Sequence, residues 1–256
     1  IQVMCSLLEQ LGVNIEQDSK NHLIQTQKRK NNFEINPLLA QKLRASILLV
    51  GPLLTQTNHL KIPYPGGCIL GRRPLEPHFK LLESFGAKVS TFPDYFEVEV
   101  TKKLNGGRIF LPEASVTVTE NALMIASTIP EETIICNAAC EPHVENLAQM
   151  LKMMGTDIQG TGTNTIHIKG RKKLNGCKIK VIPDQIEIAT WAIAAALTKG
   201  DLLVRNIIKD HLDIIFLKFT QAGVNYKLLK NKSGLDLHVY SEPKQKFNAT
   251  NITTNL

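Results

Sequence analysis

Four stretches of the chain share one hydrophobic pattern, in which an amphipathic helix ends at a glycine and an alternating run follows. They are LLEQLGVNIE (7–16), LLESFGAKVS (81–90), MLKMMGTDIQ (150–159) and KFTQAGVNYK (218–227). Glycine adopts positive φ without steric cost, so the pattern predicts helix ends at Gly12, Gly86, Gly155 and Gly223. The polar/apolar alternation after each glycine predicts a β-hairpin.

A second set of stretches interleaves with the first and is apolar on most faces. They are PLLAQKLRASILLVGPLL (37–54), ENALMIASTI (120–129) and EIATWAIAAALTKG (187–200). Their Ala and Ser content predicts buried, closely packed helices, each followed by a short apolar strand. Their expected N-terminal caps are Asn36 before Pro37, and two capping boxes formed by Thr117 with Glu120 and by Asp184 with Glu187.

Together the two patterns define a repeated unit of roughly seventy residues, in the order strand, buried helix, strand, amphipathic helix, hairpin. The predicted fold class is therefore α/β, built from βαβαββ units that pack with approximate symmetry around a shared core. The GTG at 160–162 falls between the two strands of a hairpin, so it predicts a turn and not a dinucleotide fingerprint.

The chain has 256 residues, of which 43% are apolar and 21% are charged. This composition indicates an ordinary soluble globular protein without a membrane span. Five widely spaced cysteines indicate a reducing compartment. Cys136 and Cys140 form a CxxxC pair, but no second ligand pair lies at zinc spacing, so no metal is expected. The net charge of +7 suits small anionic substrates as well as nucleic acid.

The most distinctive loop reads PYPGGCILGRRP (63–74) and places Cys68 between two glycines and two arginines. The arginines and the helix expected to begin at Pro74 would lower the thiol pKa and favour the thiolate. Gly66, Gly67 and Gly71 are expected to give the loop the freedom of a closing lid. The alternative is a surface turn with an incidental cysteine.

The motifs LRASILLVGPL, PGGCILGRRP, ENALMIASTI, NAACEP and IPDQIE resemble the UDP-N-acetylglucosamine enolpyruvyl transferase (1-carboxyvinyltransferase) family along nearly the whole chain. The PGGCxxGxRP motif is absent from the sibling family that acts on shikimate 3-phosphate. The resemblance implies two domains of three units each, in an inside-out α/β barrel. It places residues 1–182 in a first domain that lacks its N-terminal strand and residues 183–256 in a partial second domain, with the chain cut at both ends.

The resemblance implies transfer of the enolpyruvyl group of phosphoenolpyruvate to the 3-hydroxyl of UDP-N-acetylglucosamine, the first committed step of peptidoglycan synthesis. That role belongs to cell wall biogenesis, cell shape and cell division, in the cytoplasm. The reaction needs no metal and no cofactor. The implied partners are the two small-molecule substrates and the missing remainder of the second domain, with no nucleic acid and no membrane. Because the family's catalytic Asp lies in that remainder, this chain alone is expected to turn over little.

The resemblance also assigns roles to three charged or reactive residues. Cys68 matches the cysteine that forms an adduct with phosphoenolpyruvate and is alkylated by fosfomycin. Arg73 matches a contact to the phosphate of phosphoenolpyruvate, and Arg44 matches a residue near the same site. For the two arginines, the alternatives are a solvated side chain and an aliphatic stem that lies along the surface.

The expected sugar-nucleotide contacts follow these residues. Pro74, Leu75, Glu76 and His78 resemble the stretch that holds the uracil and diphosphate, although Glu76 replaces an Asp. Ser115 and Val116 match a stretch that grips the diphosphate. Thr117 replaces a glycine there, so its side chain is expected to crowd the diphosphate or to cap a helix.

Two further departures, Cys140 and Gln185, stand where the family has Arg. They leave open an inactive paralogue that binds a sugar nucleotide without turnover. A basic nucleic-acid binder is a third possibility, although aromatics form only 5% of the chain and do not interleave with the basic residues.

Overall fold

The computed structural model describes residues 1–20, 23–28, 32–67, 73–232, 234–243 and 245–252, so Cys68 and Gly71 lie outside the described residues. The chain divides into two compact units, Ile1–Lys178 and Ile179–Leu256. The division falls four residues before the domain boundary expected from the sequence.

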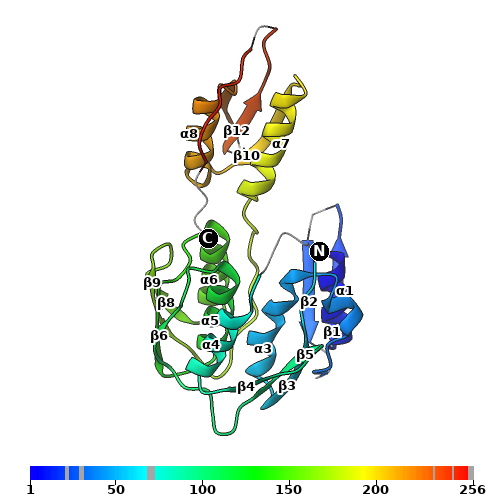
Figure 1. Cartoon of the computed structure of the whole chain (residues 1–256), viewed down its shortest axis with the longest axis vertical. Helices are drawn as coiled ribbons and strands as arrows, with labels where there is room; N and C mark the ends of the chain where they lie inside the picture. Colours follow the sequence, from blue (N-terminus) through cyan, green and yellow to red (C-terminus); the bar gives the residue numbers. More distant parts are fainter. Residues whose placement is uncertain (21–22, 29–31, 68–72, 233, 244, 253–256) are drawn as a thin grey trace. The chain divides into compact units, whose positions relative to one another are not determined.

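The first unit contains sixteen described elements, shown in Figure 1. They are α1 (Gln2–Gln10), β1 (Val13–Asp18), β2 (Leu23–Lys28), α2 (Pro37–Ala40), η1 (Arg44–Leu49), α3 (Val50–Leu54), β3 (His59–Pro63), α4 (Glu76–Ser84), β4 (Lys88–Thr91), β5 (Tyr95–Glu99), β6 (Gly107–Phe110), α5 (Val116–Ala126), β7 (Glu132–Cys136), α6 (Pro142–Met153), β8 (Asp157–Gln159) and β9 (Thr165–Lys169). The second unit contains α7 (Gln185–Leu197), β10 (Leu202–Ile207), η2 (Lys209–Leu212), α8 (Asp213–Ala222), β11 (Tyr226–Asn231) and β12 (Gly234–Val239).

Sheet topology confirms the repeated unit. Three sheets contain the same arrangement, in the strand orders β3-β5-β4, β7-β9-β8 and β10-β12-β11. In each, the strand after the apolar helix pairs antiparallel with the second strand of the following hairpin. Among the described residues, the leading strand of the unit is formed only in the middle repeat, where β6 pairs parallel with β7. The α/β class predicted from the sequence is therefore confirmed.

The four glycines of the repeat end their helices as predicted. Their φ angles are positive, +88° at Gly12, +91° at Gly86, +105° at Gly155 and +77° at Gly223. A side chain at these positions would be strained, so the helix stops and the chain enters the hairpin.

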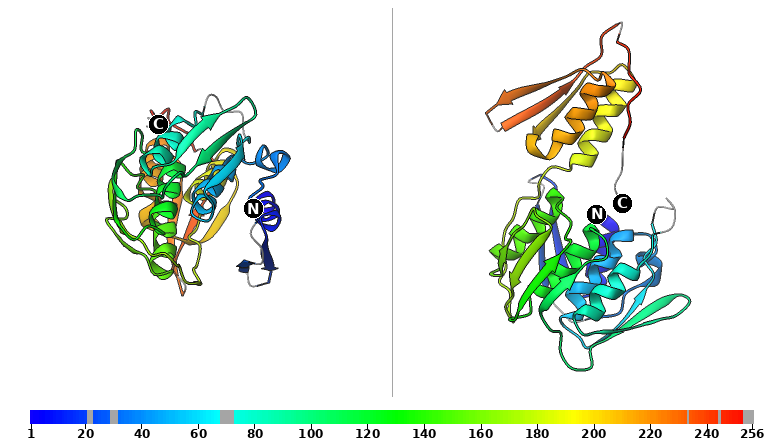
Figure 2. Two further views of the ribbon diagram at one scale, coloured as in Figure 1. Left: turned by 90° about the horizontal axis from the view of Figure 1, so that it is seen from below. Right: turned by 60° about the vertical axis from the view of Figure 1, so that its left-hand side comes forward.

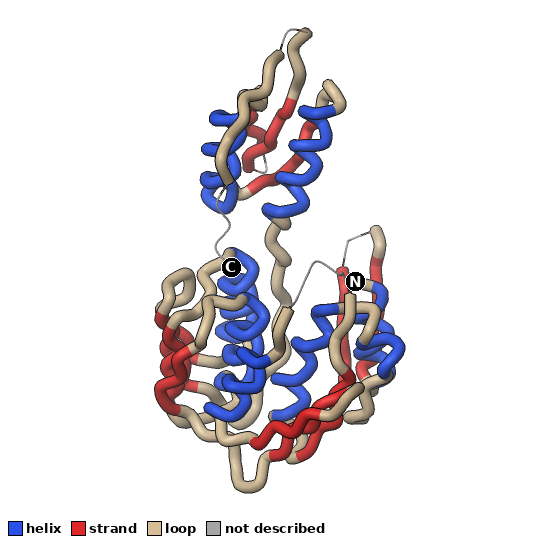
Figure 3. Tube along the Cα trace, in the orientation of Figure 1, coloured by secondary structure: helices blue, strands red, loops and turns tan. Residues whose placement is uncertain are grey.

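Helix α5 lies at the centre of the first unit. It packs against α3, α4 and α6, and the sheets lie outside these helices (Figures 1 and 3). Buried residues recur on most faces of α5: Val118, Ala122, Leu123, Ile125 and Ala126. The prediction of a buried helix at 120–129 is thus confirmed.

Helix α7 differs from the prediction for residues 187–200. Only Ile188, Ala192 and Ala196 are buried, whereas Ile186, Trp191, Ile193 and Leu197 are exposed. The right-hand view of Figure 2 shows α7 and α8 on one side of the three-stranded sheet of the second unit. Among the described residues of that unit, α7 has only this sheet and its own short core to pack on, so its outer face stays uncovered.

The prediction of a single helix at 37–54 is also wrong. The segment forms α2, a turn, the 3-10 helix η1 and then α3. Pro52 has no N–H to bond to the residue 48 carbonyl. The side chain of Asn121 replaces the neighbouring backbone bond, from the Gly51 N–H to the Ile47 carbonyl. The cap on α2 is as predicted, since Asn36 Oδ1 accepts from Leu39 N–H at 3.1 Å.

Candidate anion-binding site

Arg44 and Arg73 form a pair of cations beside the loop that carries Cys68. Arg73 belongs to the loop, and Arg44 lies against it from the preceding 3-10 helix, η1. The Arg44 Nη2 donates to the backbone carbonyl of Arg73 at 2.7 Å. Burial, and then the nearby charge of Arg73, lowers the pKa of the Arg44 guanidinium. Among the described residues, no carboxylate forms an ion pair with either arginine. Two neighbouring cations without an acidic partner make a site that favours an anion.

The chain that leads to Cys68 is packed against the Arg44 segment. The amide of Gly67 donates to the Gln41 carbonyl at 3.0 Å. A Cβ on Gly66 would lie 1.8 Å from that same oxygen, and one on Gly67, at φ +100°, would lie 2.9 Å from Arg44 N. This packing is a reason for glycine that the sequence did not indicate, and the lid-like freedom of the loop stays a prediction. Positions 66 and 67 are glycines because the backbones approach closely, and this fixes one end of the loop beside Arg44.

Helix α4 begins at Glu76, with Leu75 at the N-cap, and not at Pro74 as expected. A start at Pro74 would place Pro77 at the fourth helical position, where a backbone N–H is needed. Starting at Glu76 places Pro77 in the first turn, where its missing N–H costs nothing. Leu75 is buried in the core, so its side chain is not available to a ligand, whereas Glu76 is exposed.

A buried polar network joins three helical segments beside these arginines. Asn121 Oδ1 accepts from Gly51 N–H at 2.9 Å, and its Nδ2 donates to the Ile47 carbonyl at 3.1 Å. Asn121 Nδ2 also lies 3.4 Å from His78 Nδ1, and His78 Nε2 lies 3.1 Å from Thr117 Oγ1. Thus η1 and α3 are tied through α5 to the first turn of α4.

Asn121 therefore bridges the backbone groups that a regular helix would join directly, the N–H of residue 51 and the carbonyl of residue 47. The sequence reasoning did not single out Asn121. The available signal was a lone carboxamide within the otherwise apolar run ENALMIASTI.

The N-terminus of α5 adjoins the same network. Ser115 is the N-cap, with extended backbone at φ −82° and ψ 128°, but its side chain makes no capping hydrogen bond. The predicted capping box of Thr117 with Glu120 is wrong, because the helix begins at Val116 and places Glu120 in its second turn. The Thr117 hydroxyl contacts His78 instead. The first N–H groups of α5 are thus left without a side-chain cap.

Acidic groups lie near one another on the second turn of α5 and at the start of α6. Burial, and then the charge of Glu141, raises the pKa of Glu120 to about 7. Burial, followed by Glu141 and Glu145, raises the pKa of the Cys140 thiol. Cys140 stands where the resembled family has Arg, and the thiol supplies no positive charge to these carboxylates.

One of the two interactions of the capping box predicted for α7 is present, the N-cap by the Asp184 side chain. Asp184 Oδ1 accepts from Ile186 N–H at 2.8 Å and from Glu187 N–H at 3.2 Å. Gln185 is the first helical residue and Glu187 lies 3.5 Å from Trp191 Nε1. These contacts are structural.

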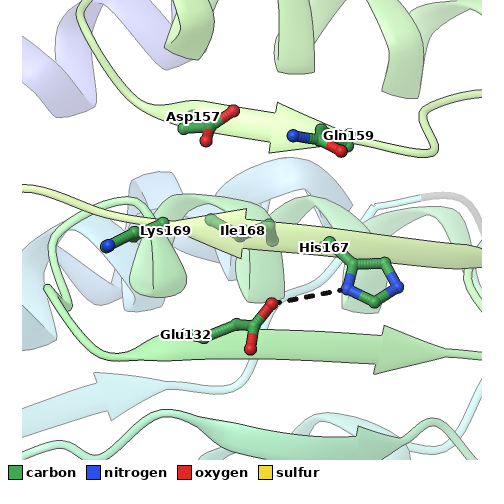
Figure 4. A pocket seen from close by; sticks show the side chains of 6 residues that line it. All are labelled: Glu132, Asp157, Gln159, His167, Ile168 and Lys169. Carbon is green, nitrogen blue, oxygen red and sulfur yellow. Dashed lines mark ion pairs between the residues drawn. The ribbon is translucent and has the colours of Figure 1, made fainter.

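A separate hollow lies on strands β7, β8 and β9 (Figure 4). Its polar lining comprises Glu132, Asp157, Gln159, His167 and Lys169. His167 Nδ1 lies 3.6 Å from Glu132 Oε1, and both side chains are about half exposed or more. The hollow is the solvent face of a half-buried sheet with mixed charge, and it contains none of the residues predicted for the site.

No group of three or more His, Cys, Asp or Glu residues in the described part of the chain is arranged to hold a metal ion. None of the described helices combines the length and apolarity needed to cross a membrane.

Residues 1–255 match the family model described as EPSP synthase (3-phosphoshikimate 1-carboxyvinyltransferase). The chain is 40% identical over 254 residues to UDP-N-acetylglucosamine 1-carboxyvinyltransferase of Lawsonia intracellularis, covering 99% of this chain and 59% of that protein. It is 41% identical over 247 residues to the protein of the same name from Treponema denticola, covering 96% and 56%.

Two solved structures share the fold. The enolpyruvyl transferase NikO from Streptomyces tendae superposes with a TM-score of 0.80 at 17% identity, covering 95% of this chain and 57% of that one. EPSP synthase from Acinetobacter baumannii gives a TM-score of 0.67 at 22% identity, covering 93% and 56%. The chain thus spans little more than half the length of the proteins that it matches.

Proposed function

Because this chain belongs to the EPSP synthase family of 1-carboxyvinyltransferases, we propose that it forms the phosphoenolpyruvate-binding part of a UDP-N-acetylglucosamine 1-carboxyvinyltransferase. The observation that carries the proposal is the Arg44–Arg73 pair beside the cysteine loop, two cations for which the described part of the chain supplies no carboxylate partner. The PGGCILGRRP motif and the names of the relatives at 40% and 41% identity support the sugar nucleotide as acceptor.

The reaction is an addition followed by an elimination. The 3-hydroxyl oxygen of the sugar bonds to C2 of phosphoenolpyruvate, C3 takes up a proton and the hydroxyl proton passes to a base. C3 then loses a proton and the bond from C2 to the phosphate oxygen breaks, which leaves the enolpyruvyl ether and inorganic phosphate. This chemistry needs an acid near C3 and cations around the phosphate and carboxylate.

In this proposal, Arg44 and Arg73 supply the cations, and Cys68 supplies the acid or the covalent adduct. The uncapped N-terminus of α5, from Ser115 and Val116, faces the sugar diphosphate, where free N–H groups suit an anion. Pro74 and Glu76, which are exposed, line the nucleotide. The His78 contact expected from the sequence is not part of this proposal, because that side chain is only 5% exposed and both ring nitrogens contact Asn121 and Thr117. The base is expected from an Asp that the family carries in its second domain, and we assign no residue of this chain to it.

The biological role that follows is peptidoglycan synthesis, and with it cell wall biogenesis and cell division, in the cytoplasm. An inactive sugar-nucleotide-binding paralogue is not favoured, because the similar proteins bear transferase names.

The test is mass spectrometry of the chain after incubation with fosfomycin, with and without UDP-N-acetylglucosamine. We expect a single modification at Cys68, promoted by the sugar nucleotide and lost in Cys68→Ser. Cys140→Ser is the matched control, because Cys140 is exposed but has a raised pKa, which makes its thiolate scarce. Equal labelling of Cys68 and Cys140, indifferent to the sugar nucleotide, would argue against the proposed function.

A further inference from the structure

The amide of Asn121 has only one orientation that its neighbours allow. Gly51 N–H can only donate, so it must meet the amide oxygen, and the Ile47 carbonyl can only accept, so it must meet the NH₂ group. Backbone groups of η1 and α3 therefore fix the amide, and its second N–H points to His78 Nδ1 at 3.4 Å.

This orientation in turn fixes the tautomer of His78. Because Asn121 presents a donor to Nδ1, Nδ1 must accept, and the single ring proton lies on Nε2. Burial, and then the charge of Arg44, lowers the pKa of His78 to about 4, so the ring is neutral at physiological pH. Nε2 then donates to Thr117 Oγ1 across 3.1 Å.

The Thr117 hydroxyl therefore accepts from His78, and its own proton must go elsewhere. No acceptor for that proton is found among the described residues. The hydroxyl lies in the first turn of α5, whose N–H groups have no side-chain cap, and its histidine partner is close enough to Arg44 to be affected by that charge. The surroundings of the free proton thus favour an anionic acceptor.

We propose that the Thr117 hydroxyl is a specificity-determining donor to a phosphoryl oxygen of the substrate, with Asn121 and His78 as positioning residues that turn its proton outward. The inference rests on the proposed function and deepens it. The sequence led us to expect that the Thr117 side chain crowds the diphosphate. In this proposal the same side chain, which replaces a glycine, strengthens binding because its hydroxyl donates a hydrogen bond.

Calorimetric titration of the full chain with UDP-N-acetylglucosamine and, separately, with phosphoenolpyruvate tests the donor role. We expect Thr117→Val, which keeps the shape and removes the hydroxyl, to weaken binding about tenfold, and Thr117→Ser to keep most of it. The ligand whose affinity falls identifies the phosphoryl group that is bound. Thr128→Val is the matched control, because Thr128 lies just after the C-terminus of α5 and its hydroxyl donates to the Ile125 carbonyl.

Thr117→Gly separates the donor role from crowding, since a crowding side chain predicts tighter binding after its removal and a donor predicts weaker binding. Tighter binding by Thr117→Gly, or unchanged binding by Thr117→Val, would overturn the inference while leaving the proposed function intact. Absence of binding by the unmodified chain would overturn both.

Nitrogen-15 NMR of the histidine rings tests the positioning step without any ligand. We expect the His78 signals, assigned by their loss in His78→Gln, to show a neutral ring protonated at Nε2 at pH 7. A ring protonated at Nδ1 would turn the Thr117 proton inward and refute the relay, whatever the binding data show.

Discussion

At the scale of the residue, Arg44 combines a structural contact with a charge that the proposed function uses. Its Nη2 holds the Arg73 carbonyl, which fixes the end of the cysteine loop, and its charge has no described carboxylate partner. The sequence alternatives for Arg44 were a surface stem or an anion ligand. The contact shows that the guanidinium is held beside the Arg73 carbonyl, and its role as an anion ligand stays a proposal.

Glu120 is the residue for which pH dependence is expected. Its pKa rises from 4.5 to about 7 in the folded chain, so the folded state holds a proton that the unfolded state releases between these values. Stability associated with this group is therefore complete below pH 4.5 and is lost as the pH rises through about 7. The full shift corresponds to about 3 kcal/mol, which partial exposure reduces to about 1–2 kcal/mol.

Urea unfolding at pH 5 and pH 8 measures this effect. We expect Glu120→Gln to increase the unfolding free energy at pH 8 by about 1–2 kcal/mol and to change it little at pH 5. Glu113→Gln is the control, because that side chain is exposed just before α5. A Glu120→Gln effect of equal size at both pH values would show that the carboxyl does not titrate in this range.

At the scale of the element, the break between η1 and α3 depends on a side chain seventy residues away. Asn121 completes the hydrogen bonds of Gly51 N–H and the Ile47 carbonyl, so the segment bends without leaving either group unsatisfied. Periodicity predicted one long helix at 37–54, because an apolar pattern records which faces are buried and not which backbone bonds are replaced.

Gly51→Ala tests this arrangement. Alanine has the better helix propensity, by about 1 kcal/mol, but its Cβ would lie 2.7 Å from Asn121 Oδ1 and 3.2 Å from the Asn121 backbone oxygen. We expect the clash and the lost buried hydrogen bonds to outweigh the gain in helix propensity, with a net loss of about 2–3 kcal/mol of unfolding free energy.

Gly176→Ala is the matched control, because nothing lies within 4 Å of a Cβ built there. Its effect on unfolding is expected within about 0.5 kcal/mol. If Gly51→Ala were equally neutral in thermal or urea unfolding, Asn121 would not be fixed as the hydrogen bonds indicate.

At the scale of the whole molecule, the two units differ in how much of their apolar surface is covered. The first has an extensive core around α5, whereas the second has a short core and leaves Trp191 58% exposed. We expect the second unit to unfold at lower denaturant concentration, because fewer buried groups stabilise it.

Trp191 is the only tryptophan of the chain, so its fluorescence reports the second unit selectively. In a urea titration, the fluorescence transition is expected to precede the main transition in far-ultraviolet circular dichroism, which reports both units. Coincident midpoints would show instead that the two units unfold together.

The sequence by itself determined the repeat. Glycines that need positive φ stop four helices, alternation makes the hairpins, and Asn36 and Asp184 cap their helices through contacts within three residues. The motifs around Arg44 and Arg73 likewise indicated the family, because they are contiguous in the chain. These features were predictable since each depends on neighbours a few positions away.

Only the tertiary structure decided the rest. Gly66 and Gly67 are constrained by packing against residues 41–44, and Thr117 contacts a histidine and does not cap its own helix. Helix α7 shares the apolar composition of α5 and yet remains uncovered on its outer face. The physical reason is that local pattern specifies conformation and hydrophobicity, whereas burial, hydrogen-bond partners and the direction of a hydroxyl proton depend on which distant segments pack together.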